Sequence, residues 1–207
     1  MRPTNDSLSF RLAFFAGGNG SAMKAVKEAA DRGALLSRVV LLVTNRPDCG
    51  ARAWARQHGI EIHDTNGDTA DDAVDLACCR ALEANHIDLV ILSGYMRKLG
   101  PRVLDRFRPS ILNTHPALLP KYGGLGMYGS RVHKAILAAG EKQSGATVHI
   151  VDGTYDTGPI LRQKAIAIAE TETSESLAAK VKMVECDLLI EILMSIEDRS
   201  LNLRKNR

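Results

Sequence analysis

Short runs of consecutive apolar residues alternate with amphipathic segments through the first half of the chain. The apolar runs are typical of buried strands, and the amphipathic segments carry apolar residues at helical spacing. We expect strands at residues 10–16, 39–44, 60–63 and 89–93, and helices at residues 21–31, 51–58 and 71–85. Strands that are apolar on both faces and separated by helices indicate a parallel sheet covered on both sides. The predicted fold class is α/β, with a doubly wound, mostly parallel sheet flanked by helices.

In the second half of the chain, apolar runs and amphipathic segments alternate less regularly. The pattern predicts helices at residues 101–107, at 132–139 and from about 173, and strands at residues 111–114, 146–151 and 160–168. The apolar residues of the last helix should pack on the sheet; they are Leu177, Val181, Val184, Leu188 and Ile192. A chain of 207 residues fits one continuous domain. We expect residues 1–207 to form that domain, with residues 1–9 and about 199–207 flexible.

The composition disfavours several classes of protein. Apolar residues make up 45% and charged residues 25%, as in a globular protein. The formal charge of +3 suits an anionic small molecule but not nucleic acid, whose binders concentrate basic residues on one face. No apolar run approaches the about 20 residues of a membrane span, so we expect no membrane contact. The four cysteines lack C-x-x-C spacing and follow no secretory leader, which favours a cytoplasmic location and no bound metal.

A glycine loop joins the first predicted strand to the first helix. Its sequence, GGNGSAMK at residues 17–24, places three glycines directly before a helix N-terminus, where free amides and the helix dipole favour an anion such as phosphate. It does not have Walker spacing and lacks the third glycine of G-x-G-x-x-G. The loop alone leaves two interpretations open, a phosphate site and a plain tight turn.

Candidate chemistry follows the strand predicted at residues 111–114. Asn113 and His115 lie at its carboxyl end, where the loops of an open α/β sheet form a crevice. An asparagine amide can donate to a developing oxyanion, and a histidine can carry a proton near neutral pH. An isolated histidine in a loop is more often a surface residue, but Asp156, in a turn after a later strand, could lie beside His115 and stabilise its protonated form.

Several motifs together resemble the folate-dependent formyltransferases. They are the glycine loop, SGYMRKL at 93–99, NTHPALLPKY at 113–122, SGATVHIVD at 144–152 and YDTGPI at 155–160. The resemblance covers about residues 10–192 and implies that family's variant of the Rossmann fold. It also implies transfer of a formyl group from 10-formyltetrahydrofolate, a cosubstrate, without a metal. The compact form with the GGNGS loop implies 5-phosphoribosyl glycinamide as the acceptor, in de novo purine biosynthesis.

The resemblance also assigns site residues. Catalysis would fall to Asn113, His115 and Asp156. The folate would be bound by Met96, Arg97, Lys98, Leu99, Asn113, Asp152, Gly153, Thr154, Tyr155 and Asp156. The phosphoribosyl substrate would be bound by Gly20, Ser21, Ala22 and Met23 at the helix start, and by Lys182 and Glu185 in the last helix. The last two are three residues apart, so they share one helix face.

Departures from the family pattern leave alternatives open. Ala22 stands where many members carry asparagine, Asp71 lies about where some carry an arginine near the folate tail, and residues 122–129 are unusually rich in glycine. A sugar-nucleotide amine formyltransferase could use the same trio. A non-catalytic folate or phosphosugar binder could keep the fold, although it would not need the trio. The sequence does not decide the oligomeric state.

Overall fold

The computed structural model describes residues 8–65 and 72–203 of the chain. Seven strands form one sheet in the order β3-β2-β1-β4-β5-β6-β7. The strands are β1 (Arg11–Phe15), β2 (Arg38–Thr44), β3 (Glu61–Asp64), β4 (Leu89–Leu92), β5 (Ile111–His115), β6 (Gln143–Ile150) and β7 (Ile160–Ala167). The helices are α1 (Ser21–Asp31), α2 (Gly50–Gln57), α3 (Asp72–Ala84), α4 (Pro101–Phe107), α5 (Ser130–Ala138) and α6 (Ser174–Glu197).

The first five strands are parallel, as the continuous apolar runs predict. The pairs β1–β2, β2–β3, β1–β4 and β4–β5 are all parallel, whereas β6 runs antiparallel to both β5 and β7. The prediction of a mostly parallel, doubly wound α/β sheet is therefore confirmed. The strand order turns back between β1 and β4, so the loops after these two strands separate and leave a crevice at their carboxyl ends.

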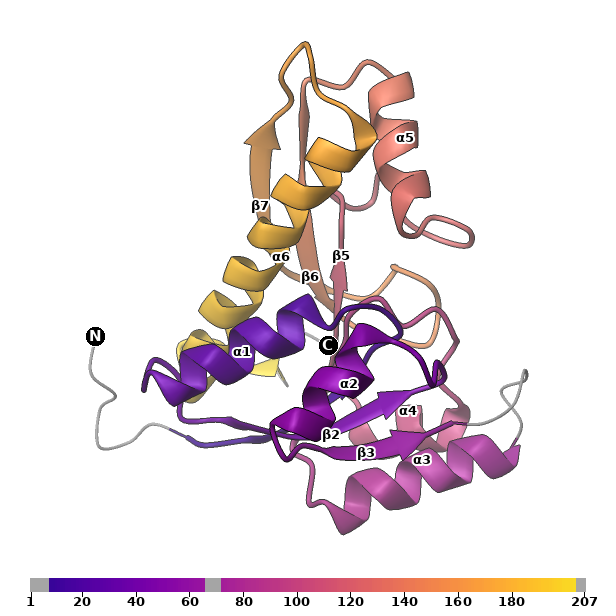
Figure 1. Ribbon diagram of the computed structural model, residues 1–207, viewed down its shortest axis with the longest axis vertical. Helices are drawn as coiled ribbons and strands as arrows, with labels where there is room; N and C mark the ends of the chain where they lie inside the picture. The colour runs from indigo at the N-terminus through magenta and orange to yellow at the C-terminus, as the bar shows by residue number, and fades with distance from the viewer. Residues whose placement is uncertain (1–7, 66–71, 204–207) are drawn as a thin grey trace.

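Side chains of β1 alternate between two hydrophobic cores. Leu12 and Phe14 pack with residues of α1, α2 and α6, whereas Ala13 and Phe15 pack with residues of α3 and α4. All four are fully buried. This explains why the strand is apolar at every position rather than at every second one. In Figure 1, α3 runs along the bottom of the view and α5 stands at the top, beside the start of α6.

The last helix joins the two halves of the fold. Thr173 and Ser176 form a capping box at its start, which satisfies backbone amides that have no helical partner. Four of the five predicted stripe residues are fully buried and Val184 is half-buried. Leu188 and Ile192 pack in the core with the sheet, as their spacing predicts, whereas Leu177 and Val181 pack with Val132 and Ile136 of α5. Within the described ranges of the chain, no helix is both long and apolar enough to span a bilayer.

The predicted flexible ends lie partly outside the described residues, which omit 1–7 and 204–207. The described parts of both ends are hydrogen-bonded or packed. The Leu8 amide donates to the Glu197 carbonyl at 2.8 Å, and the Ser9 hydroxyl donates to the Leu36 carbonyl at 3.0 Å. Leu203 packs in the core beside α6.

Candidate active site

A cleft of about 930 Å³ lies at the carboxyl ends of the parallel strands. It is lined by the glycine loop, the segments after β2, β4 and β5, the β6–β7 loop, residues 124–130 and one face of α6. Small-molecule sites range from roughly 300 to 1,000 Å³, so this cleft is large enough for two reactants side by side.

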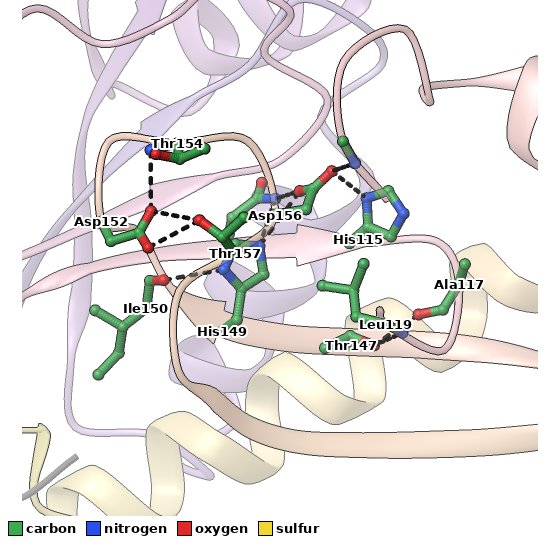
Figure 2. A network of polar contacts seen from close by, with 12 residues as sticks. His115, Ala117, Leu119, Thr147, His149, Ile150, Asp152, Thr154, Asp156 and Thr157 are labelled. Atoms are coloured by element: carbon green, nitrogen blue, oxygen red, sulfur yellow. Dashed lines mark hydrogen bonds and ion pairs between the residues drawn. The ribbon is translucent and has the colours of Figure 1, made fainter. Parts of the chain in front are cut away.

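The structure brings Asn113, His115 and Asp156 together. Asn113 and His115 lie on β5, and Asp156 reaches them from the β6–β7 loop with a left-handed backbone (φ 58°). Asp156 Oδ1 accepts from Asn113 Nδ2 at 3.2 Å, and Oδ2 lies 3.4 Å from His115 Nδ1. Figure 2 shows the His115 and His149 rings on either side of this carboxylate. The proximity expected from the sequence is therefore present in the structure.

His149 is a fourth member of the cluster. It lies opposite Asn113 in the antiparallel β5–β6 pairing. Its Nδ1 is 3.0 Å from the Ile150 carbonyl oxygen, which can only accept, so Nδ1 carries the proton. Its Nε2 is then an acceptor, 3.0 Å from Asn113 Nδ2. Both amide protons of Asn113 are thus used, by His149 and Asp156, and an incoming oxyanion has to replace one of these bonds.

His115 is nearly inaccessible, with a relative exposure of 3%. Its Nε2 lies 2.7 Å from the Tyr122 carbonyl oxygen and therefore carries a proton. Burial lowers the pKa of His115 below its ordinary value, although Asp156 and the Tyr122 carbonyl act in the opposite direction. Burial therefore favours the neutral ring in the ligand-free chain. Asp156 favours the protonated ring, as the sequence predicts, but desolvation outweighs one nearby carboxylate.

Asp156 is ionised at neutral pH. Burial raises its pKa, but the neighbouring His149, whose Nε2 lies 3.5 Å from Oδ1, the charge that His115 carries when protonated, and the Gly124 amide together outweigh burial and hold the pKa below its ordinary value. The Gly124 amide donates to Oδ2 at 2.9 Å. The site therefore pairs a neutral imidazole, whose Nδ1 can accept a proton, with a carboxylate that stabilises the resulting imidazolium.

Most of the other predicted site residues line the same cleft. They are Gly20, Ser21 and Ala22; Met96, Arg97, Lys98 and Leu99; Gly153, Thr154 and Tyr155; and Lys182 and Glu185. Two do not. The Met23 side chain is fully buried in the core, and the Asp152 carboxylate accepts from the Thr154 amide and the Thr157 hydroxyl, both at 2.9 Å, so it shapes its own loop.

The family profile described as formyl transferase matches residues 10–193 of the chain. The chain belongs to the formyl transferase family. A chloroplastic phosphoribosylglycinamide formyltransferase of Vigna unguiculata is 37% identical over 203 residues, which are 95% of this chain and 64% of the relative. The chain thus spans less than two thirds of the length of that plant protein. A phosphoribosylglycinamide formyltransferase of Mycobacterium tuberculosis is 36% identical over 188 residues, covering 90% of this chain and 84% of the relative.

Solved structures of the formyl transferase family have the same architecture. The crystal structure of phosphoribosylglycinamide formyltransferase from Bacillus halodurans superposes with a TM-score of 0.84 at 33% identity. The match covers 93% of this chain and 98% of that one. The antiparallel β6 and β7, which complete the sheet beyond the parallel strands, lie within the residues that the family profile matches.

The departures from the family pattern fall in different places. Ala22 lines the cleft on the first turn of α1, where its methyl group offers no hydrogen bond. The glycine-rich segment also lines the cleft from Gly124 to Gly129. Asp71 lies outside the described residues, so its expected effect on the folate tail stays a prediction.

Glu185 differs electrostatically from an ordinary surface carboxylate. Crowding by protein atoms raises its pKa to about 7, while the Thr114 hydroxyl and Lys182 act in the opposite direction. Its position on the cleft-facing side of α6 therefore gives a group that changes charge near neutral pH. A carboxyl in either state can accept hydrogen bonds from hydroxyl groups.

Sequence reasoning missed Asn45, Arg46 and His133, which also line the cleft. Arg46 follows β2 and lies against the glycine loop: its Cδ is 3.4 Å from the position that a Cβ on Gly17 would take. Neither Arg46 nor Lys182 pairs with a carboxylate among the described residues. The rule that strand carboxyl ends face the crevice could have identified Arg46, because β2 is next to β1.

Proposed function

We propose that the chain transfers a formyl group from 10-formyltetrahydrofolate to the amine of 5-phosphoribosyl glycinamide, giving formylglycinamide ribonucleotide in de novo purine biosynthesis. The observation that carries the proposal is the convergence of Asn113, His115 and Asp156 on a cleft that also contains a helix N-terminus with a glycine loop. The plant and mycobacterial relatives are named for the same acceptor, which supports the proposal.

The ionisation states found above fit this reaction. The amine nitrogen attacks the formyl carbon, and an Asn113 amide proton then stabilises the oxyanion of the tetrahedral intermediate. The nitrogen sheds a proton, which His115 Nδ1 accepts while Asp156 stabilises the imidazolium. The bond between the formyl carbon and folate N10 breaks, and N10 receives a proton. Protons balance, because one leaves the amine and one reaches N10.

The substrate phosphate would bind at the start of α1. Gly20 has a left-handed backbone (φ 70°) and no side chain, and Ser21 and Ala22 line the cleft at the helix start, where backbone amides have no helical partner. Arg46 and Lys182, two cationic side chains without a carboxylate partner among the described residues, would add charge on either side. Glu185 would accept hydrogen bonds from ribose hydroxyls. The folate would lie against residues 96–99 and 153–156, whose backbone groups can pair with a pterin edge.

The experiment is an acceptor panel with purified protein and 10-formyltetrahydrofolate. The acceptors are 5-phosphoribosyl glycinamide, a sugar nucleotide with a free amine, and water alone, with His115→Asn as the matched background. Rapid turnover only with the glycinamide supports the proposal. Turnover with the sugar nucleotide alone would replace the acceptor, and absence of turnover with every acceptor would favour a binding protein. A cytoplasmic location remains a proposal from the cysteine pattern, since the names of the plant relatives place those proteins in the chloroplast.

A further inference from the structure

The carbonyl that fixes the His115 tautomer belongs to a loop that also contacts Asp156. Tyr122 has a left-handed backbone (φ 58°), which turns its carbonyl oxygen back to within 2.7 Å of His115 Nε2. Two residues later, the Gly124 amide donates to Asp156 Oδ2 at 2.9 Å. A left-handed backbone is strained for a tyrosine and persists only where neighbouring contacts impose it. The contacts that impose this conformation therefore bear on the geometry of both catalytic groups.

Glu141 supplies those contacts from outside the cleft. Its Oε1 accepts from the Tyr122 hydroxyl at 3.0 Å and from Lys121 Nζ at 2.8 Å. Its own amide donates to the Ile136 carbonyl at 3.4 Å, which attaches it to the end of α5. Glu141, Tyr122 and Lys121 are absent from the described lining of the cleft. Glu141 therefore has no place in the described cleft lining, and its contact with Tyr122 connects it to His115 through the loop.

We propose that Glu141 is a positioning residue, which holds Tyr122 so that neutral His115 keeps its proton on Nε2 and presents Nδ1 as the proton acceptor beside Asp156. The catalytic meaning of this inference rests on the proposed function, whereas the tautomer is a property of the ligand-free chain. If the carbonyl moved away, the neutral ring would be more stable with its proton on Nδ1, donating to ionised Asp156. The nitrogen that must accept a proton would then already carry one.

The charges around His115 set the direction of the expected pH effect. Asp156 and the Tyr122 carbonyl favour the protonated ring, and His149 of β6 disfavours it. His133 of α5 also lies close to the ring. Burial lowers the pKa of His133, and a charge on His115 lowers it further. Loss of the carbonyl bond removes one of the two favourable interactions. The pKa of His115 should then fall further, and the limb of the pH–rate profile that reports it should move to lower pH.

Three variants separate the hydrogen bond from the ion pair. Tyr122→Phe removes the hydroxyl and keeps the ring and the backbone carbonyl. Glu141→Leu removes the acceptor, whereas Glu141→Gln retains an oxygen that can accept from the Tyr122 hydroxyl. The matched control is Glu83→Gln, which breaks an ion pair of the same length, 2.8 Å to Arg106, remote from the cleft. Near-ultraviolet circular dichroism identifies any variant that is unfolded. The variants that fold are then compared with wild type to test the inference.

The deciding measurement is ¹⁵N NMR of histidine-labelled, ligand-free protein, with His115→Asn used to assign the signal. We expect wild type, Glu141→Gln and Glu83→Gln to show the Nε2–H tautomer, and Tyr122→Phe and Glu141→Leu to show a mixture with Nδ1–H. In the last two, kcat should fall about 10-fold, less than the ~10²–10⁴ of a direct acid or base, with KM little changed.

A wild-type tautomer in both Tyr122→Phe and Glu141→Leu would overturn the inference. Equal losses of kcat in Glu141→Gln and Glu141→Leu would also overturn it, because charge rather than the hydroxyl bond would then be responsible. Failure of the wild-type chain to transfer formyl groups would instead refute the proposed function. The NMR spectrum would still decide the tautomer in that case, so the two failures are distinguishable.

Discussion

Replacing Gly20 by alanine tests how closely the glycine loop packs on the fold. The residue has φ 70°, and a Cβ there would lie 2.8 Å from the Cβ of Ala51, which is fully buried at the start of α2. Gly33, just after α1, is the matched control, since its φ is 72° and a Cβ there would meet nothing within 4 Å. Both alanines incur the left-handed penalty, and only Gly20→Ala forces α2 to move.

The structure sets the size of the two effects. The left-handed conformation costs an alanine about 1–2 kcal/mol. Forced contact with a packed core costs a further ~1–3 kcal/mol. We therefore expect Gly33→Ala to lower the free energy of unfolding by about 1–2 kcal/mol and Gly20→Ala by about 2–5 kcal/mol. Each kcal/mol corresponds to a change in Tm of about 2–4 °C in a protein of this size.

Urea unfolding of wild type and both variants measures these differences, and steady-state kinetics measures the loop's function. Gly20→Ala should also raise KM for 5-phosphoribosyl glycinamide more than KM for the folate, whereas Gly33→Ala should change neither. Equal destabilisation by the two alanines would refute the packing argument. A higher KM for the folate, with an unchanged KM for the glycinamide, would show that the two subsites are assigned the wrong way round.

Three further substitutions test individual groups. His115→Asn should lower kcat by ~10²–10⁴-fold while calorimetry finds unchanged affinity for both reactants, because the lost group acts on charge that develops during reaction. Asp156→Asn removes the carboxylate that raises the pKa of His115, so the His115 limb of the pH–rate profile should move to lower pH; an unmoved limb with full activity would contradict the pairing. Arg46→Ala should raise KM for the glycinamide, most strongly at low salt, whereas Arg38→Ala at the opposite end of β2 should not; equal effects would exclude Arg46 from the phosphate site.

Local patterns predicted the bounds of a helix well where glycine or proline residues mark its ends. The helix expected at residues 21–31 is α1 (Ser21–Asp31), because the glycines before it and Gly33 after it mark both ends. The helix expected at residues 101–107 is α4 (Pro101–Phe107), which begins at a proline. The direction of β6 could not be predicted in the same way, since the pairing of a strand depends on neighbours distant in sequence.

Some features of the site could likewise be predicted from the sequence, and others could not. Residue type and strand position identified Asn113 and His115, and the resemblance added Lys182 and Glu185. The pairing of His149 with Asn113 depends on the β5–β6 register, and the state of His115 depends on burial and on a carbonyl seven residues away. Neither is a property of a local sequence pattern. The sequence predicts that Asp156 favours a protonated His115, but it does not reveal the desolvation that acts in the opposite direction.

The function proposed for this cleft is the transfer of a formyl group from folate to an amine. The most direct measurement follows an isotope-labelled formyl group from 10-formyltetrahydrofolate by mass spectrometry in the presence of 5-phosphoribosyl glycinamide. We predict one labelled formyl group on the glycinamide for each tetrahydrofolate formed, and almost none with His115→Asn. Release of the label as formate, or equal transfer by wild type and His115→Asn, would contradict the account.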